Sequence, residues 1–297
     1  MSALPAMYRR QGRLTRLGHF LANLALWGFR MLIRPLGPTR AIRMGGWVGA
    51  RLIAGLPVTR RRIESNLARI RPELDAAVRA AIARAVGDNF GRVILEYEWM
   101  PAIARDQARY HPSGPGWSVF TAARAEGRGA ILAAAHFGNW EAVRCAAAKT
   151  GPAVAFIRRS FNNRYFDAAA TARVAEAGEP LLPRGATGAR ALIRHVRAGG
   201  AVLILVDQKQ TGAPKLDFLG HPAETVLAAA ELALKLEVPL IPVAGRRRAD
   251  GVSFDALFAT PIAPTDPTTM MQQVNNQLGA WIEADPGQWF WLHRRWR

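Results

Sequence analysis

Cysteine is nearly absent from this chain. Its single cysteine, Cys145, excludes an internal disulfide and favours a reducing compartment. The six histidines show no close paired spacing and no pair of cysteines accompanies them, so we expect no metal site. A Walker phosphate loop and a dinucleotide fingerprint are also missing, and we expect no cofactor.

Lysine and acidic residues are scarce beside arginine. The chain has 40 lysine and arginine residues against 22 aspartate and glutamate residues, and only four of the 40 are lysine. The formal net charge of +18 implies attraction to anionic membrane surfaces, phosphates or acidic proteins. The basic residues are spread along the whole chain without a basic tail or an RNA-binding signature, so nucleic acid is not an expected partner.

No uninterrupted apolar run is long enough to cross a bilayer as one helix. Residues 14–33 are largely apolar, but His19, Asn23 and Arg30 interrupt them. In helical projection these polar residues share one side with several arginines, and leucines occupy the opposite side. The pattern predicts an amphipathic basic helix that lies in the membrane interface with its arginines at the headgroups. An ordinary core-packing helix with a solvated basic face is the alternative.

Beyond Pro101 the sequence alternates between short apolar runs and helical patterns. The candidate strands are residues 117–120, 130–135, 153–157, 201–206, 239–244 and 252–258. Strands that alternate with helices predict an α/β fold with a mostly parallel central sheet flanked by helices. We expect residues 1–58 to form a membrane-associated helical segment and residues 59–297 to form the α/β domain.

The most informative segment is Ala135-His136-Phe137-Gly138-Asn139-Trp140-Glu141, which follows a predicted strand. Gly138 permits a sharp turn and Asn139 is a favoured helix N-cap. Such a corner would fold Glu141 back toward His136, so that its carboxylate accepts one imidazole proton and the other nitrogen can deprotonate a hydroxyl. Backbone N–H groups of residues 139–141 would then face an oxyanion. The alternative is a strand-end histidine and an acid that complements the helix dipole.

Five segments that carry polar residues occur in a fixed order. They are His136-x-x-x-x-Glu141, Arg158-Arg159-x-x-Asn162-Asn163-x-x-x-Asp167, Val206-Asp207-Gln208, Gly220-His221-Pro222-Ala223-Glu224-Thr225 and Trp291-Leu292-His293-Arg294-Arg295. Together they resemble the late acyltransferases of lipid A biosynthesis, the lauroyl/myristoyl transferase family, from about Thr59 onward. The chain departs from the commoner family pattern at Val206, where proline often stands, and in the loop 209–215.

The resemblance implies transfer of a fatty acyl chain from an acyl carrier protein thioester to a hydroxyl of a lipid A precursor or related glycolipid. It also implies a fold similar to that of glycerolphosphate acyltransferases and a place on the cytoplasmic face of the inner membrane. By position, His136 would be the general base and Glu141 its partner. Three alternatives stay open: another acceptor (a lysophospholipid, an amino lipid or a glycosylated phosphoinositide), acyl-CoA as donor, or a noncatalytic membrane-binding scaffold.

Two further pairs of polar residues follow predicted strands. Arg158 and Arg159 are suited to grip a phosphate of either substrate, or they form a solvated strand end. Asp207 and Gln208 end a strongly apolar strand, at the edge where α/β folds place ligands. They would orient His136, bind the acceptor or only cap a turn. Together with Asn139, these four residues are the expected substrate-binding groups.

Overall fold

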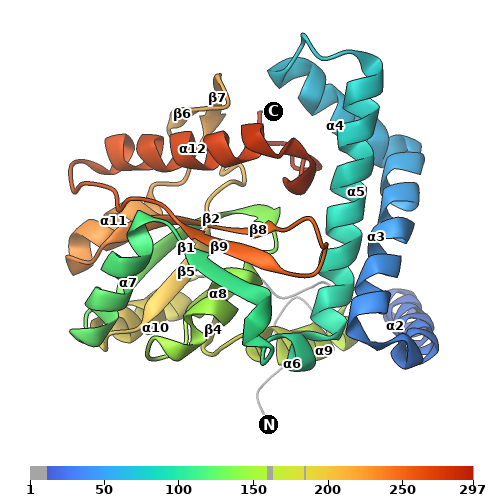
Figure 1. Ribbon diagram of the computed structural model, residues 1–297, viewed down its shortest axis with the longest axis horizontal. Coiled ribbons are helices and arrows are strands. Elements are labelled where there is room, and N and C mark those ends of the chain that lie inside the picture. The colour runs from blue at the N-terminus through green and yellow to red at the C-terminus, as the bar shows by residue number, and fades with distance from the viewer. Residues whose placement is uncertain (1–11, 159–162, 184, 297) are drawn as a thin grey trace.

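A seven-stranded sheet forms the centre of the molecule (Figure 1). The computed structural model describes residues 12–158, 163–183 and 185–296. The strand order is β1-β9-β8-β2-β5-β3-β4, and in this sheet only the β8–β9 pair is antiparallel. The strands are β1 (Tyr110–Ser113), β2 (Ala130–Gly138), β3 (Ala155–Arg158), β4 (Leu181–Pro183), β5 (Ala201–Leu205), β8 (Leu240–Arg247) and β9 (Phe254–Phe258). The predicted mostly parallel α/β sheet is therefore confirmed.

Helices cover both faces of this sheet, as the burial of β2 on both of its faces requires. Ile131 and Ala133 face one apolar cluster, and Leu132 and Ala134 face the other. In Figure 1, α12 lies above the sheet and α8 lies below it. The domain helices are α6 (Met100–Ile103), α7 (Pro115–Ala125), α8 (Glu141–Ala146), α9 (Arg164–Ala175), α10 (Ala186–Arg197), α11 (Ala228–Leu236) and α12 (Pro267–Ala284).

One predicted strand is wrong. Residues 117–120 lie inside α7 (Pro115–Ala125), which Gly114 precedes with a φ of +97° and Pro115 opens at its first position. A proline at this position loses no helical hydrogen bond, and a short apolar run fits a helix as well as a strand. A two-stranded antiparallel hairpin of β6 (Lys215–Phe218) and β7 (His221–Glu224) was not predicted.

Two N-terminal helices touch through their backbones. In α3 (Gly37–Gly55) and α5 (Ala76–Glu98), glycines face each other at the crossing. A Cβ atom on Gly91 would lie 2.1 Å from the carbonyl oxygen of Gly45, and one on Gly49 would lie 2.2 Å from that of Gly87. Because these glycines have no side chains, α5 can lie directly against α3 (Figure 1). The predicted domain boundary after residue 58 falls in the first turn of α4 (Pro57–Ile70).

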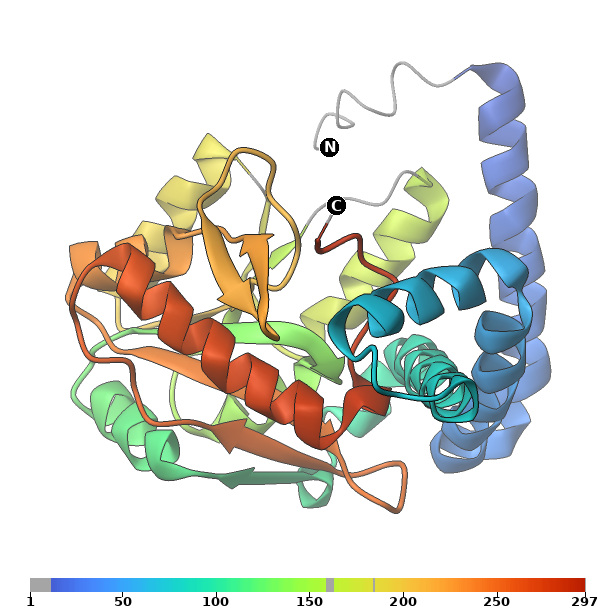
Figure 2. The same ribbon diagram turned by 90° about the horizontal axis from the view of Figure 1, so that it is seen from above.

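The first described helix, α2 (Arg13–Ile33), turns its apolar side outward and its polar side inward. Its exposed apolar residues are Leu14, Leu17, Phe20, Leu21, Leu24, Trp27, Phe29, Met31 and Leu32. Arg30 instead pairs with Glu98 of α5 at 2.6 Å, and Asn163 donates to the carbonyl oxygen of His19. The predicted helix has its arginines at the membrane headgroups, and for Arg30 this prediction is wrong. The core-packing alternative does not fit either, because the apolar side is exposed. Figure 2 shows α2 at the edge of the molecule.

Within the residues that the structure describes, no helix combines the length and the apolarity that crossing a bilayer requires.

Candidate active site

Strand β2 delivers His136 to the carboxyl edge of the sheet. The chain then turns at Gly138, whose φ is +55° and where a Cβ atom would lie 1.9 Å from the carbonyl oxygen of Gly245. Only glycine fits this turn. The C-terminal segment crosses the end of β2, because the backbone N–H of Phe290 donates to the carbonyl oxygen of His136 at 3.0 Å. The imidazole of His136 is 16% exposed.

Asp207 holds the imidazole of His136 from the neighbouring strand. It follows β5, which pairs in parallel with β2. Its Oδ1 lies 2.8 Å from Nδ1 of His136, and its Oδ2 accepts the backbone N–H of His136 at 2.8 Å and the indole N–H of Trp289 at 2.9 Å. Asp207 is fully buried, yet the imidazoles of His136 and His293 hold its pKa well below the usual range. The ionised carboxylate therefore accepts the proton on Nδ1, and Nε2 keeps its lone pair.

The structure corrects the predicted partner of His136. Glu141 is buried, and its carboxylate accepts the hydroxyl of Tyr97 at 3.0 Å and the guanidinium of Arg144. The turn at Gly138 directs this carboxylate toward α5 and the interior, while Asp207 takes the position beside the imidazole. The prediction that Glu141 orients His136 is therefore wrong in its geometry.

Two of the three backbone N–H groups predicted to hold an oxyanion are already engaged. The N–H of Asn139 donates to the carbonyl oxygen of Gly245 at 2.8 Å, and the N–H of Glu141 donates to Oδ1 of Asn139 at 3.0 Å. The Asn139 side chain thus accepts an N–H at the start of α8, but the N-cap of this helix is Trp140 and not Asn139 as expected; Nδ2 of Asn139 donates to Glu96 at 2.8 Å. Asn139 is 2% exposed, so its amide serves the corner rather than a substrate.

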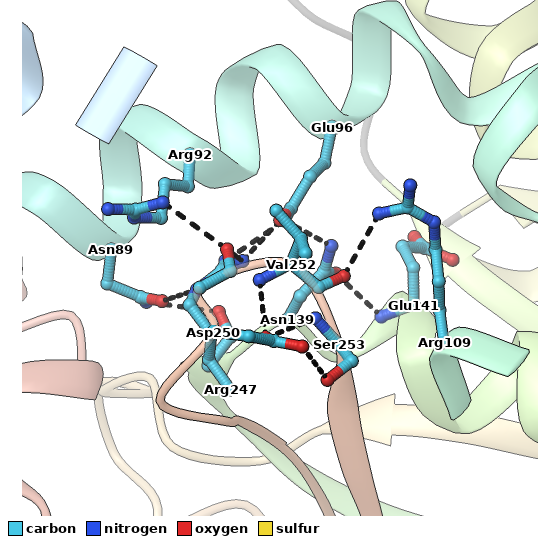
Figure 3. Close-up of polar contacts among 12 residues, drawn as sticks. Asn89, Arg92, Glu96, Arg109, Asn139, Glu141, Arg247, Asp250, Val252 and Ser253 are labelled. Atoms are coloured by element: carbon cyan, nitrogen blue, oxygen red, sulfur yellow. Dashed lines mark hydrogen bonds and ion pairs between the residues drawn. The ribbon is translucent and has the colours of Figure 1, made fainter. Parts of the chain in front are cut away.

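A buried polar network beneath this corner holds it in place (Figure 3). The guanidinium of Arg247 on β8 pairs with Glu96 and donates to Oδ1 of Asn89 at 3.0 Å. Asn89 in turn donates to the carbonyl oxygen of Gly138 at 3.1 Å. A buried charge pair of this kind needs all its partners, because a charge left alone in the interior is costly. Sequence reasoning missed these residues, since no local pattern joins α5 to β8.

A pocket of about 130 Å³ opens beside the imidazole of His136. Helix α5 supplies one wall, and the corner after β2 and the C-terminal segment supply the others. The lining residues are Val86, Asn89, Phe90, Val93, His136, Gly138, Trp140, Gln288, Trp289, Phe290 and His293. Most of these side chains are apolar, so the imidazole faces a site that suits a hydrocarbon chain next to one polar reaction centre.

Gln208 and His293 lie beside the imidazole of His136, and His293 also lines the pocket. Nε2 of Gln208 lies 3.4 Å from Nε2 of His136 and 3.2 Å from Nε2 of His293. The two imidazole rings lie 4.9 Å apart between centroids. Burial lowers the pKa of His293 to about 4, so this ring is neutral at neutral pH. The sequence placed His293 only in a terminal motif, and its segment Trp291-Leu292-His293-Arg294-Arg295 was the available signal.

Arg158, the first residue of the predicted arginine pair, contacts helix α9. The guanidinium of Arg158 bonds to Asp167 and Thr171 of α9, which accounts for the Arg-to-Asp spacing in the sequence. Arg159 lies outside the described residues. Of the predicted site residues, the structure thus gathers Asp207 and Gln208 around the imidazole of His136.

Comparisons with known proteins identify the family of this chain. The sequence profile described as "Bacterial lipid A biosynthesis acyltransferase" matches residues 9–297. The chain is also similar to the phosphatidylinositol mannoside acyltransferases of two Mycobacterium tuberculosis strains, H37Rv and CDC 1551. They are 28% and 27% identical over 284 residues, which cover 90% of this chain and 85% of each relative. The resemblance seen in the sequence is confirmed, and this chain belongs to the bacterial lipid A biosynthesis acyltransferase family.

Proposed function

We propose that this protein transfers a fatty acyl chain from a carrier protein thioester to a hydroxyl of a membrane glycolipid. The observation that carries the proposal is the His136 imidazole, held by Asp207, with its Nε2 lone pair beside an apolar pocket. Membership of the family supports acyl transfer. The names of the mycobacterial relatives support a glycolipid acceptor, which makes a mannosylated phosphoinositide a candidate beside a lipid A precursor.

His136 acts as the general base in this proposal. Its Nε2 takes the proton of the acceptor hydroxyl as the oxygen attacks the thioester carbonyl carbon, and Asp207 stabilises the resulting imidazolium. When the tetrahedral intermediate collapses, the C–S bond breaks and the imidazolium returns the proton to the leaving thiolate. Transfer is direct. The one cysteine, Cys145, is buried, and burial raises the pKa of its thiol to about 12, which makes it a poor nucleophile.

We propose that α2 attaches the protein to the cytoplasmic face of the inner membrane. Its outward side is apolar, with Leu14 at 86% and Leu32 at 77% exposure. Trp47, Leu52 and Val58 extend the exposed apolar residues into α3 and α4. An apolar helix face buried in the acyl boundary gains the hydrophobic transfer free energy that it lacks in water. The net charge of +18 adds attraction to anionic lipids.

Acyl transfer is tested with purified protein, total membrane lipid and a set of donors. Acyl carrier proteins and acyl-CoAs that bear different chains are supplied separately, and mass spectrometry identifies the acylated lipid. We expect product with a carrier protein donor, a loss of about 10² to 10⁴ in rate for His136→Ala, and no change for His111→Ala at the far edge of the sheet. No product with any donor would favour the scaffold alternative, and an active His136→Ala protein would overturn the assignment of the base.

Membrane attachment is tested by sedimentation with anionic phospholipid vesicles. Leu17→Glu and Leu24→Glu place a charge on the outward side of α2, where both leucines are at least half exposed. We expect both variants to lose most of their vesicle binding and to keep their fold. Val119→Glu on α7, at 40% exposure, is the matched control and should bind as the wild type does. Unchanged binding of the leucine variants would overturn this role of α2.

A further inference from the structure

A second imidazole shares the pocket with the general base. His293 stands beside His136, and the side chain of Gln208 contacts both rings. The backbone of this segment is held from α4, because Nδ2 of Asn66 donates to the carbonyl oxygens of Trp291 at 2.6 Å and His293 at 2.9 Å. The second ring is therefore a fixed part of the site.

The proton on His136 determines which end of the Gln208 amide faces the reaction. Asp207 binds the N–H at Nδ1, so Nε2 of His136 carries a lone pair and needs a donor as its neighbour. The group 3.4 Å away is the amide nitrogen of Gln208, which carries two hydrogens. The same nitrogen lies 3.2 Å from Nε2 of His293, which accordingly presents a lone pair as well. Two imidazole lone pairs thus receive the two amide hydrogens.

The surroundings of His293 keep that lone pair available. Burial lowers the pKa of His293 to about 4, and the nearby charge of Arg295 acts in the same direction, while Asp207 opposes them. Arg295 also holds the backbone of Gln208, since its guanidinium donates to the backbone carbonyl oxygen of Gln208 at 3.2 Å. Both the backbone and the amide of Gln208 are therefore held.

The reaction needs an oxyanion donor, and two of the three backbone N–H groups at the corner after β2 do not provide one. The N–H groups of Asn139 and Glu141 already donate within the protein. When the acceptor hydroxyl binds to Nε2 of His136, it displaces the Gln208 amide from that lone pair. The N–H that this exchange frees lies beside the reacting imidazole, which faces a mostly apolar pocket. A hydrogen bond to developing charge is strongest in such a setting.

We propose that the Gln208 amide stabilises the oxyanion of the tetrahedral intermediate and that His293 is the positioning residue that keeps the amide nitrogen turned toward it. This inference rests on the acyl transfer proposed above. Gln208 is then a catalytic residue, whereas His293 acts only through Gln208.

Kinetics of matched variants test the pair. His293→Phe keeps a ring against Phe290, which lies 4.8 Å away between centroids, but removes the lone pair. We expect kcat to fall about tenfold with an unchanged donor KM, and His293→Gln, which restores an acceptor oxygen, to recover most of it. Gln208→Leu should lose about 10² to 10³ in kcat. Adding His293→Phe to Gln208→Leu should cost nothing more, and multiplied losses would overturn the positioning role.

A spectroscopic measurement separates this inference from the proposed function. ¹⁵N NMR of the histidine rings at pH 7 should show both His136 and His293 neutral and protonated on Nδ1, with both Nε2 signals shifted by Gln208→Leu. An active protein whose His293 is protonated on Nε2 would overturn this inference alone. A wild-type protein without acyl transfer would overturn the proposed function and with it the oxyanion role, whichever tautomers are seen.

Discussion

Asp207 contacts His136 at two places, through the imidazole and through the backbone. Its Oδ1 lies 2.8 Å from Nδ1 of the ring, and its Oδ2 receives the backbone N–H of the same residue at 2.8 Å. A third N–H, from the indole of Trp289, also reaches Oδ2 at 2.9 Å. In the tautomer that leaves Nε2 of His136 free, all three N–H groups donate to the Asp207 carboxylate. Position 207 therefore requires a side chain that only accepts hydrogen bonds.

Asp207→Asn should place the histidine proton on the wrong nitrogen. Two N–H donors converge on the position of Oδ2, so the amide oxygen will occupy it and the amide nitrogen will face Nδ1 of His136. That nitrogen donates, which moves the imidazole proton to Nε2 and removes the base. We expect kcat to fall on the order of 10⁴-fold, as in the corresponding change in a serine protease triad.

The measurement is steady-state acyl transfer with the fold checked by circular dichroism. Asp255→Asn on β9, where the carboxylate pairs with Arg246 at 2.9 Å near the surface, is the control and should keep wild-type activity. If Asp207→Asn retained more than a tenth of wild-type kcat, the carboxylate would not be the orienting group.

Glu141→Leu should act mainly on stability. Its carboxylate is the partner of Arg144, which is wholly buried and also donates to the carbonyl oxygen of Val154 at 3.0 Å. Removal of one member of a buried ion pair costs about 3 to 5 kcal/mol. Urea denaturation should show a loss of this size, and the double variant with Arg144→Met should recover part of it. Wild-type stability combined with complete loss of activity would restore Glu141 as a direct partner of His136.

The corner at His136 could be predicted because its signals are local. An apolar run, a glycine at a left-handed turn and an asparagine just before the helix follow one another in the sequence. Each of them favours the same strand-turn-helix structure. The partner of His136 could not be derived in this way. Asp207 reaches the imidazole only because β5 lies beside β2, and sequence spacing does not determine strand order.

Helix α2 illustrates another limit of sequence reasoning. Periodicity showed that it has one apolar and one polar side, but not which side meets the protein. A helix that packs on the core of a water-soluble protein is expected to turn its apolar side inward. In α2, Arg30 contacts Glu98 instead, and the leucines point away from the protein. The reversal depends on a charged partner on α5, which is distant in the sequence.

Gly91→Ala should destabilise the protein and impair the site together. The methyl group would collide with the backbone of Gly45, so α3 and α5 must move apart. Overpacking of this kind costs about 1 to 3 kcal/mol. Because Phe90 and Val93 line the pocket from the same turn of α5, activity should fall as well. Gly28→Ala on α2, where nothing lies within 4 Å of the added methyl, is the control.

The same unfolding titration in urea measures both variants. Gly28→Ala should unfold at or slightly above the wild-type midpoint, because alanine favours a helix over glycine by roughly 0.5 to 1 kcal/mol. Equal midpoints for Gly91→Ala and the wild type would show that the helices tolerate separation at their crossing.

His293 should make the protein less stable as the pH falls from about 6.5. Burial lowers its pKa from 6.5 to about 4, so between these values the unfolded chain binds a proton that the folded protein does not. The stabilising contribution of the neutral ring is complete above pH 6.5 and is lost progressively as the pH approaches about 4. The slope that belongs to this single proton is at most about 1.4 kcal/mol per pH unit.

His293→Phe removes this proton-linked contribution, so the difference between the wild-type and variant unfolding free energies should change steadily between pH 6.5 and about 4. A comparison of the two proteins is needed because burial also lowers the pKa of His195, and that contribution cancels in the difference. His111→Phe, at an exposed position, should follow the wild type throughout. A pH-independent difference for His293→Phe would mean that the second imidazole has the same pKa in the folded and the unfolded protein, and burial would then not be what keeps its lone pair available to hold Gln208.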